Sequence, residues 1–189
     1  MLDLQPAAID DANALSDLRE AAARWLVGRG IRQWLSGEVR ATTIREQIEA
    51  GDWFLHRQRG TPIVALRFLW SDPLFWGQQA DDAAYVHGLV IDRQLAGEGL
   101  GAAALGWAEE TARAAGRTFL RLDHAADNVR LARYYRERGF IERGRREFDV
   151  WGPVTLVEKL LGADGQDRRT RKTPEVDDLR GSPGTTGTR

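Results

Sequence analysis

Three glycines stand at alternate positions within residues 96–101, which read Ala-Gly-Glu-Gly-Leu-Gly between a β-like run and a helical pattern. Because glycine has no Cβ atom, the backbone can turn tightly there, and successive N–H groups can point at one site where the helix begins. A concave row of backbone N–H groups of this kind binds phosphate. The same glycines also suit a purely structural bend that packs a helix closely on the preceding strand. The rest of the chain has to decide between these two interpretations.

Helical and strand patterns alternate through residues 1–161. Amphipathic spacing predicts helices, and runs of β-branched and aromatic residues predict strands. The expected elements are, in order, helices at 11–28 and 43–51, hairpin strands at 53–56 and 63–70, a strand at 85–91, a helix at 100–115, a strand at 117–123, a helix at 128–138, and strands at 145–150 and 155–160. This order predicts a single α/β domain of the α+β kind over residues 1–161.

The composition of residues 162–189 differs from that of the domain. This segment mixes both signs of charge with Gly, Pro, Ser and Thr and has almost nothing to bury, which is typical of a disordered tail. The whole chain has no cysteine, so disulfides, thiolate metal sites and an acyl-cysteine intermediate are excluded, and no metal is expected.

Charge and hydropathy narrow the possible partners. A net charge of -1 gives no bulk attraction to nucleic acid or an anionic membrane. The N-terminus is acidic where a secretory signal is basic, and the apolar runs stop short of the roughly 20 residues that a membrane span requires. We therefore expect a cytoplasmic protein that binds neither nucleic acid nor membrane.

A dinucleotide-binding fold is the main alternative for the glycine turn. Residues 97–102 also satisfy the pattern G-x-G-x-x-A, and Asp123 lies roughly 20 residues downstream, where a ribose-binding acid belongs. Against this alternative, residues 92–96 separate the strand from the first glycine, whereas the dinucleotide fingerprint follows its strand directly. The hairpin and the closing strands also leave no room for a six-stranded doubly wound sheet. The Walker pattern of nucleoside triphosphatases is absent.

Together, three features resemble the GNAT superfamily of N-acetyltransferases over nearly all of residues 1–161. The strand at 89–91 and the glycine turn are similar to its motif [RQ]-x-x-G-x-G/A. Asn128, Tyr135 seven residues later and the closing pair Gly139-Phe140 are similar to its second motif. The order of elements matches as well. The resemblance implies a mixed, mostly antiparallel central sheet flanked by about four helices, with acetyl-CoA as the co-substrate.

The resemblance also implies which residues hold coenzyme A. They are Leu89, Val90, Ile91, Ala96, Gly97, Glu98, Gly99, Leu100, Gly101, Asn128 and Tyr135. One departure from the family pattern concerns Ala96, which stands where arginine or glutamine is usual, and another concerns Arg93, which stands where proline is common. Backbone donors survive an alanine, so we expect the pyrophosphate to be held almost entirely by backbone amides, with a weaker affinity for coenzyme A.

Acyl transfer to an amine needs a neutral amine, a stabilised oxyanion and a protonated leaving thiolate. By the resemblance, backbone N–H groups at 89–91 polarise the carbonyl and Tyr135 protonates the sulfur, while Tyr134 faces the other way. Core packing is the alternative role for Tyr135, and a helix cap is the alternative role for Asn128. His87 lies two residues before Leu89, on the same face of the strand, and titrates near neutrality, so it is the candidate base. The alternative for His87 is a core or substrate-shaping histidine.

The acceptor pocket is expected where the first helices meet the segment after the hairpin, with Trp34, Trp70 and Asp72 as candidate contacts. Aromatic walls and a carboxylate suit a small cationic amine, although tryptophans at such spacing also suit a core. The sequence thus predicts an acetyl-CoA-dependent N-acetyltransferase that acts by direct attack on an amine of a small molecule or peptide. A catalytically idle acyl-CoA-binding or sensory domain is the alternative. The oligomeric state stays open, with a homodimer among the options.

Overall fold

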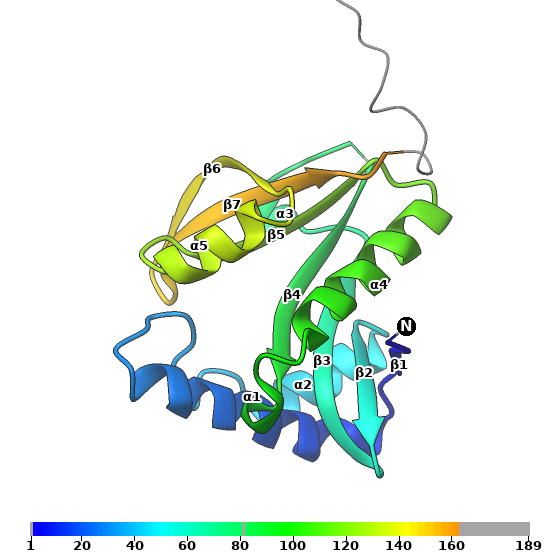
Figure 1. Cartoon of the computed structure of the whole chain (residues 1–189), viewed down its shortest axis with the longest axis vertical. Coiled ribbons are helices and arrows are strands. Elements are labelled where there is room, and N and C mark those ends of the chain that lie inside the picture. The colour runs from blue at the N-terminus through cyan, green and yellow to red at the C-terminus, as the bar shows by residue number, and fades with distance from the viewer. Residues whose placement is uncertain (1, 81, 163–189) are drawn as a thin grey trace, which may run out of the picture.

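One seven-stranded sheet runs through the computed structural model, which describes residues 2–80 and 82–162 (Figure 1). Only β4 and β5 pair in parallel, and every other neighbouring pair is antiparallel. In spatial order the strands are β1 (Gln5–Pro6), β2 (Trp53–Gln58), β3 (Thr61–Leu69), β4 (Ala83–Ile91), β5 (Phe119–Ala125), β7 (Gly152–Leu160) and β6 (Ile141–Phe148). The predicted mixed, mostly antiparallel sheet is confirmed, and a doubly wound dinucleotide fold is excluded. Residues 163–189 of the predicted tail lie outside the described residues.

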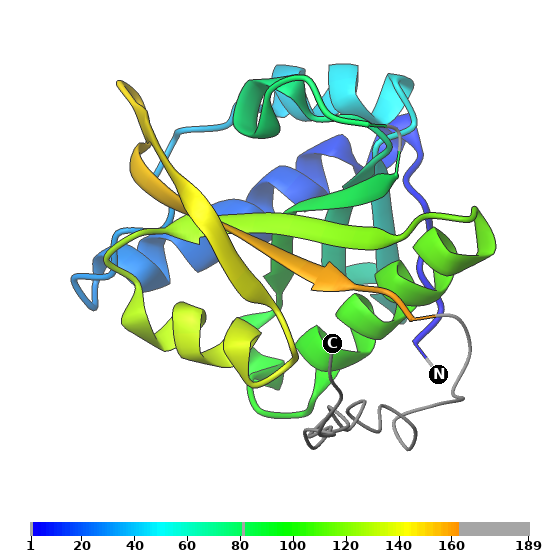
Figure 2. The same ribbon diagram turned by 90° about the horizontal axis from the view of Figure 1, so that it is seen from above.

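Helices cover both faces of the sheet. Figure 2 shows one layer on one face and a second layer on the other. The first layer comprises α1 (Ala12–Val27), α2 (Ala41–Glu49) and α3 (Pro73–Trp76), and the second comprises α4 (Leu100–Ala114) and α5 (Val129–Arg136). The fifth helix, α3, is a single turn in the segment for which we predicted no helix. Helix α2 begins two residues before the predicted start. No helix of the described residues is long and apolar enough to cross a membrane.

Small side chains let the helices pack closely on the sheet. Helix α1 buries Ala12, Leu15 and Ala22 against Trp53 and Leu55 of β2, and all five are at most 5% exposed. On the other face, α4 buries a stripe at helical spacing, namely Ala104, Leu105, Ala108 and Ala112. Each fully buried leucine of such a layer contributes roughly 1.5–3 kcal/mol to folding. These two layers hold β4 in the middle of the molecule.

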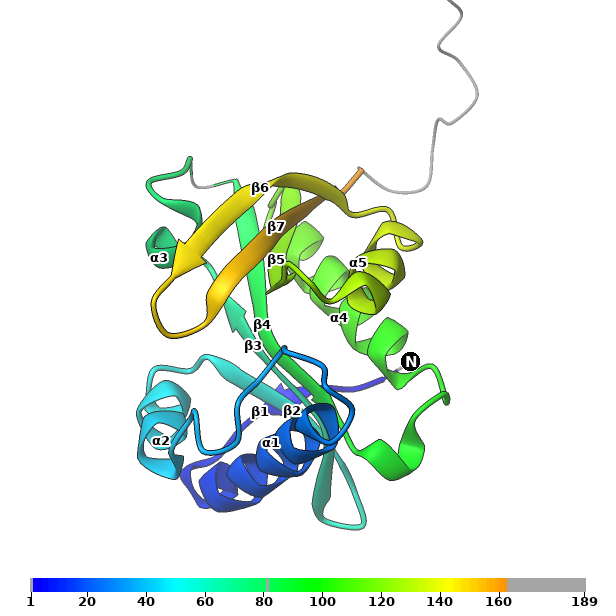
Figure 3. The same cartoon turned by 90° about the vertical axis from the view of Figure 1, so that its left-hand side faces the viewer.

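Strands β4 and β5 part halfway along β4. Their pairing ends at Val86 and Leu122, although β4 continues to Ile91. Gly88 lies just beyond this point with a φ of 59°, and one extra residue of β4 bulges out between the pairs that His87 and Val90 make with β3. A Cβ atom at position 88 would lie 2.9 Å from the ring of Trp53, so glycine is required there. Figure 3 shows the two strands diverging, which opens the sheet beside residues 87–91.

Candidate active site

A cavity of about 1000 Å³ occupies the opening between the parted strands. Its wall includes residues 86–91 of β4, the glycine turn, the first turn of α4, one face of α5 and the segment between α1 and α2. Since β5 no longer pairs with β4 here, the backbone edge at residues 87–91 is open toward the cavity. Of the predicted coenzyme residues, all but Glu98 line it, and the Glu98 side chain is exposed.

The glycine turn adopts the conformation expected of an anion-binding site. Gly97 and Gly99 have φ values of 99° and 79°, in the region that favours glycine. Gly99 is the N-cap of α4, so the first N–H groups of this 15-residue helix have no helical partner. Gly101 lies in that first turn, and a Cβ atom there would be 2.8 Å from the Tyr134 hydroxyl. The turn therefore presents backbone donors in a space that side chains would fill.

Three arginines gather beside the glycine turn. The guanidinium of Arg93 lies 3.6 Å from the ring centroid of Trp25, and that of Arg29 lies 4.0 Å from the same ring. Burial, together with the positive charges of Arg29 and Arg130, lowers the pKa of Arg93. None of the three is paired with a carboxylate of the described residues. Positive charge thus collects near Ala96, whose methyl group offers no hydrogen-bond donor.

Two tyrosines of α5 line the cavity. Tyr135 is 7% exposed and stacks on His124 at 6.0 Å, while the ring of Tyr134 lies edge-on to it at 5.5 Å. The prediction that Tyr134 faces the other way is wrong, because it also borders the cavity. Burial, and next to it the negative charge of Asp123, raises the pKa of Tyr135. Its phenol therefore stays protonated at neutral pH, which a general acid requires.

His87 lies between two carboxylates. Its Nε2 atom is 2.9 Å from Oδ2 of Asp72, and its Nδ1 atom is 3.0 Å from Oδ1 of Asp123. Burial opposes the charged ring, but the hydrogen bonds to Asp123 and Asp72 outweigh it and raise the pKa of His87 to about 9. This raised pKa differs from the predicted titration near neutrality and favours the imidazolium form at pH 7. We call these three residues the His87 cluster; with two carboxylates and one cation it carries a charge of -1.

The His87 cluster does not form a metal site. The two carboxylates bind opposite ring nitrogens, so their oxygens do not converge with the imidazole on one point. Within residues 2–80 and 82–162, no group of three or more potential ligands is arranged to hold a metal ion. The cluster is instead a local negative site beside the open edge of β4.

Comparison with known proteins matches this architecture to one family. The model of the Acetyltransferase (GNAT) family matches residues 16–140. An uncharacterised N-acetyltransferase of Bacillus subtilis (strain 168), YesJ, is 33% identical over 144 residues, which cover 71% of this chain and 79% of YesJ. The chain belongs to the GNAT family of acetyltransferases.

Solved structures agree with this assignment. A GNAT-family acetyltransferase from Listeria monocytogenes 4b F2365 is 27% identical with a TM-score of 0.71, covering 85% of this chain and 95% of its own. The YncA protein of Salmonella typhimurium, solved with its cofactor acetyl-CoA, shares the fold at 16% identity and a TM-score of 0.62. The match covers 90% of this chain and 99% of YncA. As a GNAT-family member, the protein is an acyltransferase of the N-acetyltransferase class.

The aromatic wall of this GNAT cavity differs from the predicted one. Trp34 and Asp72 line the cavity as predicted, and Asp72 also caps α3. Trp70 does not; it is 43% exposed and packs edge-on against Phe68 at 4.9 Å. Phe75 takes the expected place, with its ring 5.0 Å from that of His87. Sequence reasoning missed Phe75 because nothing local shows that the single turn of α3 folds back over β4.

Asn128 has the capping role that was its alternative. Its Oδ1 atom accepts a hydrogen bond from the N–H of Leu131 at 3.1 Å, and its Nδ2 atom donates to Oε1 of Gln33 at 3.1 Å. The same Gln33 oxygen accepts from the N–H of Ala125 at the end of β5. The cap thus ties α5, β5 and the segment after α1 together at the cavity wall.

Proposed function

We propose that this acetyltransferase transfers the acetyl group of acetyl-CoA directly to an amine of a small molecule or peptide. The observation that carries the proposal is the parting of β4 from β5. Along the strand edge that this opens lie a glycine turn flanked by arginines and the anionic His87 cluster. These sites are suited to the phosphates of the donor and the ammonium of the acceptor. The acetyl-CoA held by the Salmonella protein supports the choice of donor.

Two features of the chain organise the donor in this proposal. The glycine turn and the first turn of α4 bind the pyrophosphate through backbone N–H groups, and Arg93 and Arg130 add positive charge. The open N–H groups of β4 at residues 89–91 donate to the thioester carbonyl and stabilise the oxyanion as it forms. Asn128 contributes to the pantetheine contact through the amide hydrogen that Gln33 does not use.

The acceptor amine attacks the carbonyl carbon in the next step. A C–N bond forms, the tetrahedral adduct collapses, and the C–S bond breaks to release the thiolate, which Tyr135 protonates. The His87 cluster attracts the ammonium form of the acceptor. His87 can accept a proton from the acceptor ammonium only after its own ring has been deprotonated. The rate of acetyl transfer therefore rises with pH toward the alkaline range.

A phenylalanine substitution at Tyr135 tests the chemical role. Tyr135→Phe removes only the hydroxyl, so we expect kcat to fall about 100-fold or more while KM for acetyl-CoA and the melting temperature change little. Free CoA released with a panel of amines is measured with a thiol-reactive dye. Tyr134→Phe is the matched control, since it removes the neighbouring hydroxyl of the same wall. Equal rates for Tyr135→Phe and the parent protein would exclude Tyr135 as the acid.

The same assay separates an enzyme from an idle binding domain. An enzyme releases CoA with at least one class of amine, at a rate that depends on the amine concentration. If no amine releases CoA while acetyl-CoA still raises the melting temperature, the chain is a binding or sensory domain and the proposed function fails.

A further inference from the structure

Two further arginines line the cavity on the side of the His87 cluster. Arg67 comes from β3, where it is the direct cross-strand partner of His87, and Arg19 comes from α1. The Nη1 atom of Arg19 lies 3.6 Å from the position that a Cβ atom would take at Gly88, next to His87. Cross-strand neighbours have Cα atoms about 4.5–5.5 Å apart, so Arg67, Arg19 and the His87 cluster border one small region.

The donors of these arginines are only partly used. A guanidinium has five N–H donors. Arg67 binds Asp52 through Nη2, but its buried Nε has no hydrogen-bond partner among residues 2–80 and 82–162. Within the described part of the chain, Arg19 has one carboxylate contact, to Glu38 at 3.5 Å, and its guanidinium lies 4.5 Å from the ring centroid of Trp34. Both side chains are largely buried, at 11% exposed for Arg19 and 24% for Arg67.

Leaving buried donors unfilled costs free energy unless a ligand fills them. Burial lowers the pKa of Arg19, and the neighbouring charge of Arg67 acts in the same direction against the opposing effect of Glu38. Arg19 and Arg67 thus repel each other at the cavity wall. A carboxylate of a bound ligand would offset this repulsion and accept hydrogen bonds from their N–H groups. The planar fork of each guanidinium matches the two oxygens of a carboxylate.

We infer that Arg19 and Arg67 bind a carboxylate of the acceptor, so that the acceptor is a zwitterion, a primary amine that also carries a carboxylate, such as a free α-amino acid. This inference rests on the proposed function and narrows its substrate class. The ammonium of the acceptor faces Asp72 and Asp123 of the His87 cluster, and its carboxylate faces the two arginines. The cross-strand pairing of Arg67 with His87 puts the two binding groups on neighbouring positions of one cavity wall.

Other amine classes fit this region less well. A polyamine brings a second cation against Arg19 and Arg67. A peptide N-terminus has its first carbonyl in an amide, so it offers no charge to the arginines. The apolar ring of Phe75 beside His87 leaves a surface for the side chain of an amino acid with an apolar group.

Matched acceptors that differ only in the carboxylate test the inference. For phenylalanine, methionine and glutamate, the free amino acid is compared with its α-amide in steady-state assays of CoA release. We expect kcat/KM for at least one acid to exceed that for its amide about 10-fold or more. In Arg67→Gln and Arg19→Gln this ratio falls toward 1, through a higher KM for the acid. Arg57→Gln is the control, because Arg57 pairs with Asp11 outside the cavity. We expect the acid-to-amide ratio of kcat/KM to stay unchanged in this variant.

Conservative variants guard against a purely structural effect. Arg67→Lys and Arg19→Lys keep the charge and lose the fork, so we expect an intermediate ratio, with melting temperatures recorded for all variants. Acids and amides used equally by the parent protein would overturn the inference while leaving the proposed function standing. A loss shared equally by acid and amide in the arginine variants would also overturn it. Binding of acetyl-CoA with no turnover of any amine would overturn the proposed function and this inference together.

Discussion

Two clusters of buried charge lie on the same face of the sheet, two residues apart along β4 and β5, and they differ in how far their charges are matched. The first joins Tyr85 and Arg121, which are register partners where the strands are still paired. The second is the His87 cluster, in which His87 and Asp123 follow just beyond the last pair. Alternation along each strand puts both clusters on one face. The sheet is closed at the first cluster and open at the second.

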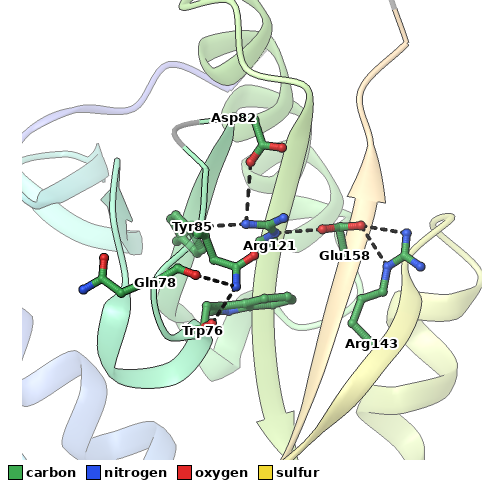
Figure 4. Close-up of polar contacts among 8 residues, drawn as sticks. Trp76, Gln78, Asp82, Tyr85, Arg121, Arg143 and Glu158 are labelled. Carbon is green, nitrogen blue, oxygen red and sulfur yellow. Dashed lines mark hydrogen bonds and ion pairs between the residues drawn. The ribbon is translucent and has the colours of Figure 1, made fainter.

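In the first cluster, the guanidinium of Arg121 is bound by protein partners (Figure 4). Arg121 donates from Nε to Glu158 at 2.7 Å and from Nη1 to the Tyr85 hydroxyl at 3.0 Å, with Asp82 at 3.8 Å. Glu158 also accepts from Nε of Arg143 at 2.8 Å. Two cations face two carboxylates, so no net charge is left over. Arg121 and Glu158 also border a cavity, of about 570 Å³, but their charges are matched. The His87 cluster keeps a charge of -1 beside the cavity of about 1000 Å³, so the two clusters differ in unmatched charge rather than in access to a cavity.

The largest effect is expected from Glu158→Ala. This change leaves Arg121, which is 6% exposed, without its main partner, and breaking a buried pair in this way costs about 3–5 kcal/mol of the free energy of unfolding. Denaturant unfolding measures the loss. Glu147→Ala, at an exposed glutamate of the adjacent strand, is the control and is expected to be nearly neutral. Equal stabilities for the two variants would show that the closed cluster does not hold the sheet together.

A smaller, pH-dependent effect is expected from His87→Gln. The folded-state pKa of His87, about 9, is raised above its ordinary value of 6.5, so its stabilisation is complete below about pH 6.5 and is lost as the pH rises through about 9. We expect the variant to be less stable than the parent by on the order of 1–3 kcal/mol at pH 6.5, with the difference shrinking by pH 9.5. Denaturant unfolding across this range measures it.

His56→Gln is the matched control for that experiment, because His56 lies in β2 and its polar partner among the described residues is a backbone carbonyl. Its stability difference from the parent should be small. A pH-independent loss in His87→Gln would mean that the ring is held as a neutral packing group, and the contrast between the two clusters would then disappear.

The smallest effect is expected from Arg143→Ala. Its side chain is 47% exposed, so its bond to Glu158 is an edge contact that solvent screens, and Arg121 still pairs with Glu158 after the change. We expect a loss below about 1 kcal/mol in denaturant unfolding. A loss as large as that of Glu158→Ala would show that the network acts as one unit rather than through the buried Arg121–Glu158 pair.

Local patterns were enough to predict most of the fold. Alternation and helical spacing predicted every long element within a few residues, and Asn128 with Gly139-Phe140 marked the helix that carries Tyr135. The short turn of α3 escaped prediction because a four-residue helix has no period to detect. Tyr134 was misplaced because adjacent helical residues diverge by about 100°, and a wide cavity accepts both.

The site was only partly predictable. The sequence identified His87 and Asp72 as candidates but not their contact, because they are 15 positions apart in the sequence, with α3 between them, and only packing brings them together. Asp123 also fits the position of a ribose-binding acid in a dinucleotide fold, and nothing in the sequence pairs it with His87. The pKa of His87 could not be foreseen, since it depends on two carboxylates that approach from opposite sides.

By itself the sequence determined the order of the elements, the family and the glycine turn, because these depend on spacing along the chain and on backbone conformations that only glycine adopts readily. Tertiary structure alone decided where β4 leaves β5, which aromatic residues form the wall, and that Arg19 and Arg67 stand beside the His87 cluster. Charge and burial act through space rather than along the chain. An imidazole or a guanidinium therefore acquires its state, and its possible partner, only when distant segments have packed around it.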